Sequence, residues 1–334
     1  MLAITLSIDA DRSDVEYLRG ARRLASMRTI LVILGFALGA RSSHVCAEAN
    51  HAARPDAWLA ELTDRVIADL AAGKPLVVQA HVPLCDNRII RCGNPKLGDG
   101  DSPADNLYWA TTEGFVGWFG RRSSGWREVF RGDGASVGEP AVLEVRVWER
   151  GIAAPRAWRV RGVPARFTVR VIAFAWRGQD IDRGLAAYWA DLFGTGTRSI
   201  QIDARTQIAA GGAAQIVAYV GHNRLYDVAP PDWAALEQSD APVRGTIAIA
   251  CNTGPFFADH VAARTRVPLV FTRDFLMASA GAFEGAVLGF AGGGDYHAIR
   301  AATAHGYATA GNANEQRITG VFTNPGDRHW GHWE

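Results

Sequence analysis

The sequence predicts an α/β fold with a mainly parallel sheet, helices on both faces and a β-hairpin insertion. Short apolar strand-like runs alternate with helical segments along much of the chain, and this alternation is typical of parallel sheets. Hydrophobic residues make up 48% of the 334 residues, enough for a sizeable core. No internal repeat, low-complexity segment or linker interrupts the pattern, so we expect a single domain over residues 48–334.

Residues 27–47 have the composition of a secretory signal peptide. A basic start is followed by an apolar stretch near residues 30–40 and by small residues. Val45 and Ala47 occupy the two positions that a signal peptidase needs small, so we expect cleavage after Ala47. The apolar stretch is short for a membrane span, although an N-terminal anchor remains the alternative.

Residues 1–26 precede this unit and carry many charges. We expect them to be untranslated or disordered, with translation starting at Met27. The mature chain is then exported to a periplasmic or extracellular location and has no stable membrane insertion.

The individual elements follow from periodicity. Helices are indicated by apolar residues at helical spacing, strands by Val-rich or continuously apolar runs, and loops by Gly, Pro, Asn and Asp. In chain order these are a helix at 56–74, a buried strand at 75–87, a loop at 91–106, an aromatic helix at 106–120, strands at 141–151 and 165–178, a helix at 180–194, strands at 215–220, 246–251 and 267–273, and a helical segment at 279–292.

The charge balance points away from polyanionic partners. Lys and Arg number 35 against 34 Asp and Glu, a formal net charge of +1. We therefore expect no nucleic acid partner, and the sequence carries no signal for the oligomeric state.

The cysteines are informative because removal of the signal peptide leaves an odd number. Cys85 and Cys92 are close in sequence and are a candidate disulfide, which leaves Cys251 as a free thiol. The alternative for Cys251 is a buried, unreactive side chain.

Polar residues follow three predicted strands. His222 and Cys251 end two of them, and a group around Asp86 ends the first. The carboxyl ends of parallel strands lie at one edge of a sheet, where ligands bind. A histidine can deprotonate a thiol or stabilise the thiolate, and backbone amides near Gly221 and Cys251 are candidates for an oxyanion hole.

Two short blocks carry a resemblance to a known family. Their order is an apolar strand, Gly221-His222, a spacer, a second apolar strand and Ala250-Cys251. This order resembles the signature of the caspase, legumain and gingipain group of cysteine peptidases, over roughly residues 75–290. The resemblance implies a caspase-like fold with His222 as general acid/base and Cys251 as nucleophile.

Asn223 departs from that group, in which a glycine usually follows the histidine and helps to form the oxyanion hole. Here Gly221 precedes the histidine, so the Asn223 side-chain amide is a substitute donor. The resemblance also makes Asp86, with its neighbour Asn87, a candidate pocket for a substrate Arg or Lys. The alternative is that these two residues only hold the loop.

Asp227 lies five residues after His222 and can either orient the imidazole or cap the following segment. The motifs "CDN", "GDG", "NLYW", "GHN" and "AC" are also similar to those of a set of secreted bacterial proteins without an assigned activity.

Other candidate ligand sites have weaker signals. Asp99, Asp101 and Asp105 lack the spacing of a calcium loop, and a turn with a helix cap is the alternative. His329 and His332 are too few for a metal centre by themselves. The glycines at 292–294 lack the residues of a phosphate loop. We expect no metal and no cofactor.

These observations favour a secreted cysteine hydrolase, a peptidase with a Cys251-His222 dyad acting on a peptide or protein. The main alternative is a catalytically inactive caspase-like binding or signalling module. A third class is a hydrolase of carbohydrates or cell-wall amides, suggested by the 11 tryptophans; tryptophans more often fill cores.

Overall fold

The computed structural model describes residues 55–203, 205–236, 241–263, 265–277, 279–311 and 315–333. The expected signal peptide, its cleavage site and the start at Met27 lie outside these residues.

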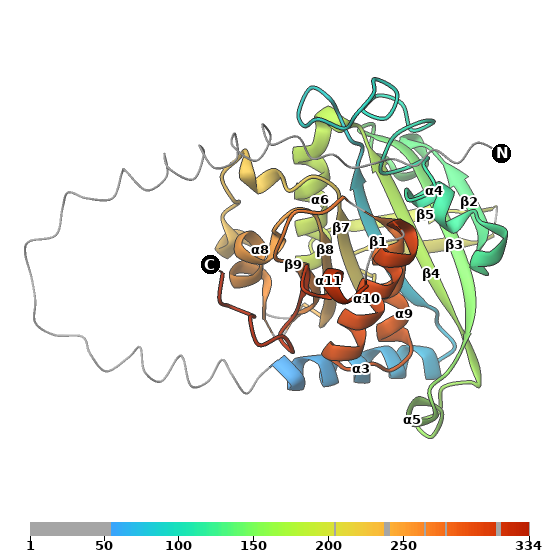
Figure 1. Ribbon diagram of the computed structural model, residues 1–334. Helices are drawn as coiled ribbons and strands as arrows, with labels where there is room; N and C mark the ends of the chain where they lie inside the picture. Colours follow the sequence, from blue (N-terminus) through green and yellow to red (C-terminus); the bar gives the residue numbers. More distant parts are fainter. Residues whose placement is uncertain are drawn as a thin grey trace, which may run out of the picture. The chain divides into compact units, whose positions relative to one another are not determined.

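An eight-stranded sheet runs through the molecule in the order β10-β9-β8-β7-β1-β4-β3-β2, and β5 and β6 form a separate two-stranded sheet (Figure 1). The strands are β1 (Leu76–Pro83), β2 (Arg127–Gly132), β3 (Val142–Ala153), β4 (Arg166–Trp176), β5 (Thr197–Gln201), β6 (Gln207–Gly211), β7 (Ile216–Val220), β8 (Arg244–Ile249), β9 (Arg266–Thr272) and β10 (Phe322–Thr323).

The sheet is mainly parallel, which confirms the predicted α/β class. Strands β4, β1, β7, β8 and β9 are parallel, whereas β10, β3 and β2 join antiparallel at the two edges. The parallel strands, numbered along the chain, lie in the order second, first, third, fourth, fifth. The direction of winding therefore changes between β1 and β7, and such a switch point opens a crevice at the carboxyl ends of the strands.

Helices cover both faces of the sheet (Figure 1). One apolar cluster joins α3, α4, α9 and α10 to the sheet, and a second joins α6 and α8 to the opposite face. No described helix is long and apolar enough to cross a membrane. The α-helices are α3 (Pro55–Ala71), α4 (Phe115–Phe119), α5 (Arg156–Arg159), α6 (Ile181–Phe193), α7 (Trp233–Leu236), α8 (Thr253–Val261), α9 (Ala280–Ala291), α10 (Tyr296–Gly311) and α11 (Glu315–Thr319); short 3₁₀ turns are η1 (Arg122–Ser124), η2 (Gly134–Val137), η3 (Gly178–Asp180) and η4 (Arg224–Tyr226).

The helix expected at 106–120 is shorter than predicted. Only Phe115–Phe119 is helical, and the residues before it form turns. The cause is the buried Asn106 side chain, whose oxygen accepts the N–H groups of Cys85 and Tyr108 at 3.0 and 3.2 Å. An asparagine that bonds its neighbours' backbone in this way competes with helix formation.

Tryptophans mostly fill the core rather than line a groove. Those that are buried are Trp109, Trp118, Trp126, Trp148, Trp158, Trp176 and Trp189. Two of them, Trp118 and Trp126, donate their indole N–H to Glu284 at 2.7 and 2.6 Å. The tryptophan count thus gives no support to a carbohydrate-binding cleft.

A buried polar network lies under α6 on the β1 strand. The His81 and Asp191 side chains are both fully buried, with His81 Nε2 2.9 Å from the Asp191 carboxylate. His81 Nδ1 accepts from Trp176 Nε1 at 3.1 Å, so Nε2 carries the proton and donates to Asp191. Burial lowers the pKa of His81, which keeps the ring neutral. Arg198 pairs with the other carboxylate oxygen, so His81 is a satisfied core histidine.

Replacing Asp191 should destabilise the fold strongly. We expect Asp191→Ala to lower the free energy of unfolding by about 3–5 kcal/mol, because it leaves Arg198 and His81 without their buried partner. Asp64→Ala is the matched control, since Asp64 pairs with Arg161 on the surface and its loss costs at most about 1 kcal/mol. Urea unfolding of the two variants measures the difference, and equal losses would contradict this account.

Candidate active site

His222 and Cys251 follow the carboxyl ends of two neighbouring parallel strands. Strands β7 and β8 are paired with Val220 opposite Ile249. His222 and Cys251 each lie two positions beyond these partners. Because neighbouring strands are about 4.8 Å apart, this register brings the backbone segments that carry the two residues to the same edge of the sheet.

Hydrogen bonds continue past the strand ends and hold the two segments together. The Gly221 N–H donates to the Ile249 carbonyl at 3.1 Å. The fully buried Asn223 donates through Nδ2 to the Cys251 carbonyl at 2.8 Å and accepts from the Leu225 N–H at 3.1 Å. Two of the expected oxyanion donors, the Gly221 amide and the Asn223 side chain, are therefore engaged in joining the strand ends, whereas the Cys251 N–H takes part in neither of these bonds.

Asp227 contacts the imidazole directly. His222 Nε2 lies 2.7 Å from Asp227 Oδ2, and Arg224 pairs with the same oxygen at 3.2 Å. His222 Nδ1 is buried and has no hydrogen-bond partner among the described residues. A carboxylate at Nε2 favours the tautomer with the proton on Nε2, which leaves Nδ1 with a free lone pair.

The Cys251 thiol is the free cysteine of the described residues and is partly buried. Its sulfur donates to the Leu276 carbonyl at 3.4 Å. Burial raises the thiol pKa, and the negative charge of Asp274 raises it further. Asn252, next in sequence, has φ of 57°, so the chain turns sharply between Cys251 and α8.

Two tyrosines from distant parts of the chain interact electrostatically with Cys251. Burial and then the Cys251 charge raise the pKa of Tyr108. The pKa of Tyr307 is raised by burial, lowered by the Met277 N–H and raised by the charges of Glu113 and Cys251. Sequence reasoning missed both tyrosines. Tyr108 lies in the quoted "NLYW" motif, whereas Tyr307 lies in α10 without any local signal.

Arg88 forms an ion pair with the Asp86 carboxylate. Its carboxylate is buried and accepts from Arg88 Nε at 2.8 Å and from its terminal nitrogen at 2.6 Å. The Arg88 hydrogen bond is the main cause that lowers the pKa of Asp86. Arg88 also pairs with Asp101 at 2.8 Å. A substrate cation would reach Asp86 only after Arg88 moved away.

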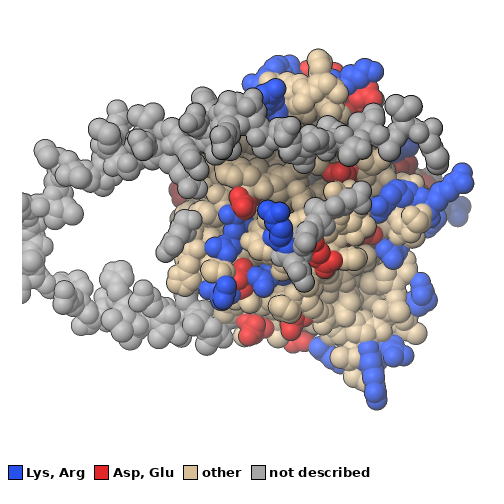
Figure 2. Space-filling view, in the orientation of Figure 1, with Lys and Arg blue, Asp and Glu red and all other residues tan. Residues whose placement is uncertain are grey.

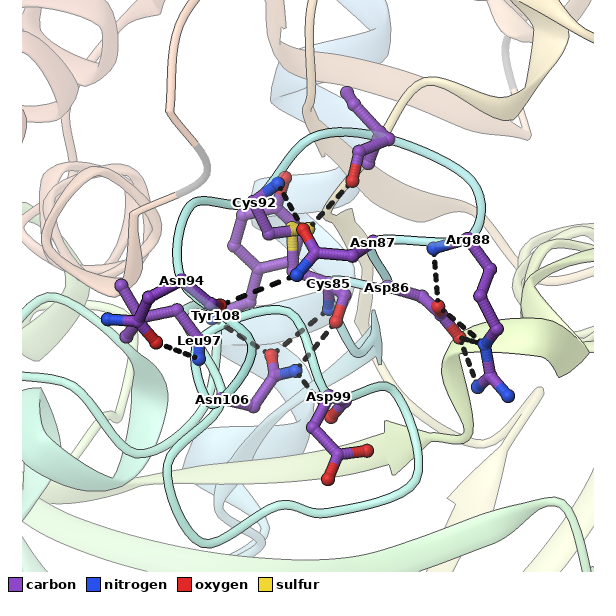
Figure 3. Close-up of a disulfide and its surroundings, with 11 residues drawn as sticks. Cys85, Asp86, Asn87, Arg88, Cys92, Asn94, Leu97, Asp99, Asn106 and Tyr108 are labelled. Carbon is purple, nitrogen blue, oxygen red and sulfur yellow. Dashed lines mark hydrogen bonds and ion pairs between the residues drawn. A yellow bond between two sulfur atoms is a disulfide. The ribbon is translucent and has the colours of Figure 1, made fainter.

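The loop after β1 is held by a disulfide and two asparagines (Figure 3). Cys85 and Cys92 form a disulfide with their Cα atoms 6.0 Å apart, the pairing expected from the sequence. Asn87 accepts the Cys92 N–H at 2.9 Å, and Asn106 bonds both backbone groups of Cys85 at 3.0 and 2.8 Å. The loop is thus fixed from both sides.

The weaker ligand candidates have structural partners. Asp99 accepts the Asp101 N–H at 3.0 Å, and Asp101 pairs with Arg177 at 2.8 Å. His329 Nε2 accepts from Arg328 Nε at 3.0 Å. Within the part of the chain that the structure describes, no three His, Cys, Asp or Glu side chains gather as metal ligands.

The surface charges are mixed on the face drawn in Figure 2. Lys and Arg lie among Asp and Glu over most of this face, and basic residues gather at the lower tip, where Figure 1 places α5. This face offers no broad field of one sign.

Comparison of the chain with protein-family models, with curated proteins and with solved structures gives no match.

The free protein should hold Cys251 as a thiol. We expect iodoacetamide to label it with a midpoint pH above the ordinary thiol value of about 8.5, because burial and Asp274 oppose the thiolate. Asp274→Asn should lower the midpoint, since it removes the charge and keeps the acceptor for the Phe275 N–H. Mass spectrometry of labelling rates against pH, with urea-unfolded protein as control, measures both. A native midpoint below that of the unfolded chain would refute this assignment.

Proposed function

We propose that the protein is an exported cysteine hydrolase of caspase-like fold that cleaves peptide bonds. Cys251 is the nucleophile, His222 the general acid/base and Asp227 the residue that orients the imidazole. The observation that supports the proposal is the register of β7 and β8, which brings the segment with a free thiol and the segment with a carboxylate-bound histidine to one edge of the sheet.

Cys251, His222 and Asp227 can together carry out both steps of an acyl transfer. His222 Nδ1 takes the thiol proton as the sulfur attacks the scissile carbonyl, and the same proton passes to the departing amine when the C–N bond breaks. A water molecule then attacks the thioester, giving one proton to His222, which returns it to the sulfur as the acid leaves. Asp227 stabilises the intermediate imidazolium through Nε2.

The oxyanion donor beside the sulfur is the Cys251 backbone N–H, which also favours the thiolate of its own side chain. The amide of the nucleophile itself has this role in other hydrolases. In the free state the sulfur donates to Leu276, so a rotation of the Cys251 side chain toward His222 must precede attack.

Two further features agree with the proposal. A disulfide between Cys85 and Cys92 is the kind of bond that persists in oxidising compartments, which supports export. The antiparallel strands β2 and β3 fall between β1 and β4 in the chain, and we assign them as the hairpin insertion of the caspase-like sheet.

A second candidate is a catalytically inactive binding or signalling module with the same fold. It is favoured by the raised pKa of Cys251 and by the contact of the sulfur with the Leu276 carbonyl. A thiol without a catalytic role does not need a base to remove its proton. Turnover distinguishes the two candidates.

Peptide hydrolysis should depend on Cys251, His222 and Asp227. With a fluorogenic peptide library, we expect Cys251→Ser to abolish hydrolysis, His222→Ala to lower kcat about 10²- to 10⁴-fold, and Asp227→Asn to lower it at least about tenfold. His305→Ala is the matched control, because His305 pairs with Glu315 on the surface. Hydrolysis by the wild type that survives in Cys251→Ser, or a complete lack of turnover by the wild type, would contradict the proposal.

A further inference from the structure

We infer that the site selects peptides with a large apolar side chain on the residue that supplies the scissile carbonyl. The inference rests on the proposed function and adds its substrate class. The binding surface is formed by Tyr226, Phe275 and Met277, which we name the apolar rim.

The exposed large hydrophobic side chains gather at this site. Among the residues that the structure describes, those with high exposure are Val160 at 78%, Phe275 at 48%, Tyr226 at 42% and Met277 at 39%. Three of them form the rim, and Val160 stands apart at the end of α5. A single exposed apolar residue is ordinary, whereas a gathered set marks an interaction site.

The rim is fixed to the nucleophile. Phe275 and Met277 flank Leu276, whose carbonyl oxygen is 3.4 Å from the Cys251 sulfur. The Met277 N–H donates to the Tyr307 hydroxyl at 3.3 Å. Phe275 and Met277 are therefore each one residue away from Leu276, which contacts the Cys251 sulfur directly.

The rim is also fixed to the histidine side of the site. Tyr226 follows His222 by four positions in the turn held by Asn223. The Tyr226 ring lies 4.6 Å from the Phe256 ring and 6.2 Å from the Phe275 ring, almost parallel to the latter at 12°. Residues after β7, after β8 and after β9 thus form one aromatic surface beside the dyad.

The chemistry of the step decides which substrate residue meets this surface. In the thioester, the acyl carbon is bonded to the Cys251 sulfur, and Leu276, which contacts this sulfur in the free state, is flanked by Phe275 and Met277. A large apolar side chain would cover surface that is otherwise in water, which is favourable by the hydrophobic effect.

Charged acyl residues fit less well. Asp274, next to the rim, already raises the pKa of the thiol by its charge and repels an acidic side chain. The Asp86 carboxylate, the alternative pocket for Arg or Lys, is paired with Arg88 at 2.6 Å. The apolar preference is therefore the one that the local side chains support.

The test uses the wild-type protein and peptidyl-coumarin amides that differ only at the acyl residue. We expect kcat/KM for Phe or Leu to exceed that for Ala by at least about tenfold, the range in which apolar pockets discriminate. Phe275→Ala should lower kcat/KM for the Phe substrate about five- to tenfold, chiefly through KM, and leave the Ala substrate within about twofold. Val160→Ala, a change of an exposed apolar side chain away from the site, should alter neither.

Each outcome has a separate meaning. Cys251-dependent turnover that prefers Lys or Arg, or that ignores the acyl residue, overturns the apolar rim and leaves the proposed function standing. A lack of any Cys251-dependent turnover overturns the proposed function and the rim with it. Equal losses for the Phe and Ala substrates in Phe275→Ala would show that Phe275 supports the loop rather than the substrate, and would also overturn the inference.

Discussion

The pairing of β7 with β8 is the constraint on which the rest of the site depends. A shift of one residue would move His222 away from Cys251 and turn the strand side chains to the wrong face. Both strands are buried on both faces, so such a shift would be penalised along their whole length. Asn223 adds a hydrogen bond from its side chain to the Cys251 carbonyl, which extends the pairing beyond the strands.

The surroundings of Cys251 and His222 act on the two side chains in opposite ways. Burial raises the pKa of Cys251 and so favours the neutral thiol, whereas in the proposed mechanism Asp227, bonded to Nε2, orients His222 so that Nδ1 accepts the proton. A neutral thiol is stable to unwanted reactions, because the thiolate is the reactive species. In the proposed mechanism, proton transfer from Cys251 to His222 requires that the substrate replace the contact between the sulfur and Leu276.

The sequence could predict what is local and periodic. The apolar spacing in α3 and the continuous apolar runs of β7 and β8 correspond to the observed elements, and strand ends in a parallel sheet meet at one edge whatever their separation in sequence. The positions of His222 and Cys251 followed from that rule. The pairing of Cys85 with Cys92 followed from their closeness in the chain.

The other features of the fold and of the candidate site depend on contacts between residues far apart in the chain, which sequence spacing does not predict. Tyr307 reaches the site from α10, and the segment around Leu276 reaches it from the loop after β9, without any motif. The Arg88 side chain fills the place beside Asp86 that a substrate cation was expected to take. The aromatic segment at 106–120 has helical spacing, but the side-chain hydrogen bonds of Asn106 hold its first part in turns.

The most direct measurement of the central claim is disulfide formation in His222→Cys. Neighbouring parallel strands place facing Cα atoms about 4.8 Å apart, within the range of about 4.4–6.8 Å that a disulfide requires. Mild oxidation of the folded variant should therefore join positions 222 and 251, seen by mass spectrometry as a cross-linked peptide, while His305→Cys should leave Cys251 free. If both thiols of His222→Cys stay reduced under oxidation, the two residues do not face each other and the proposed dyad is wrong.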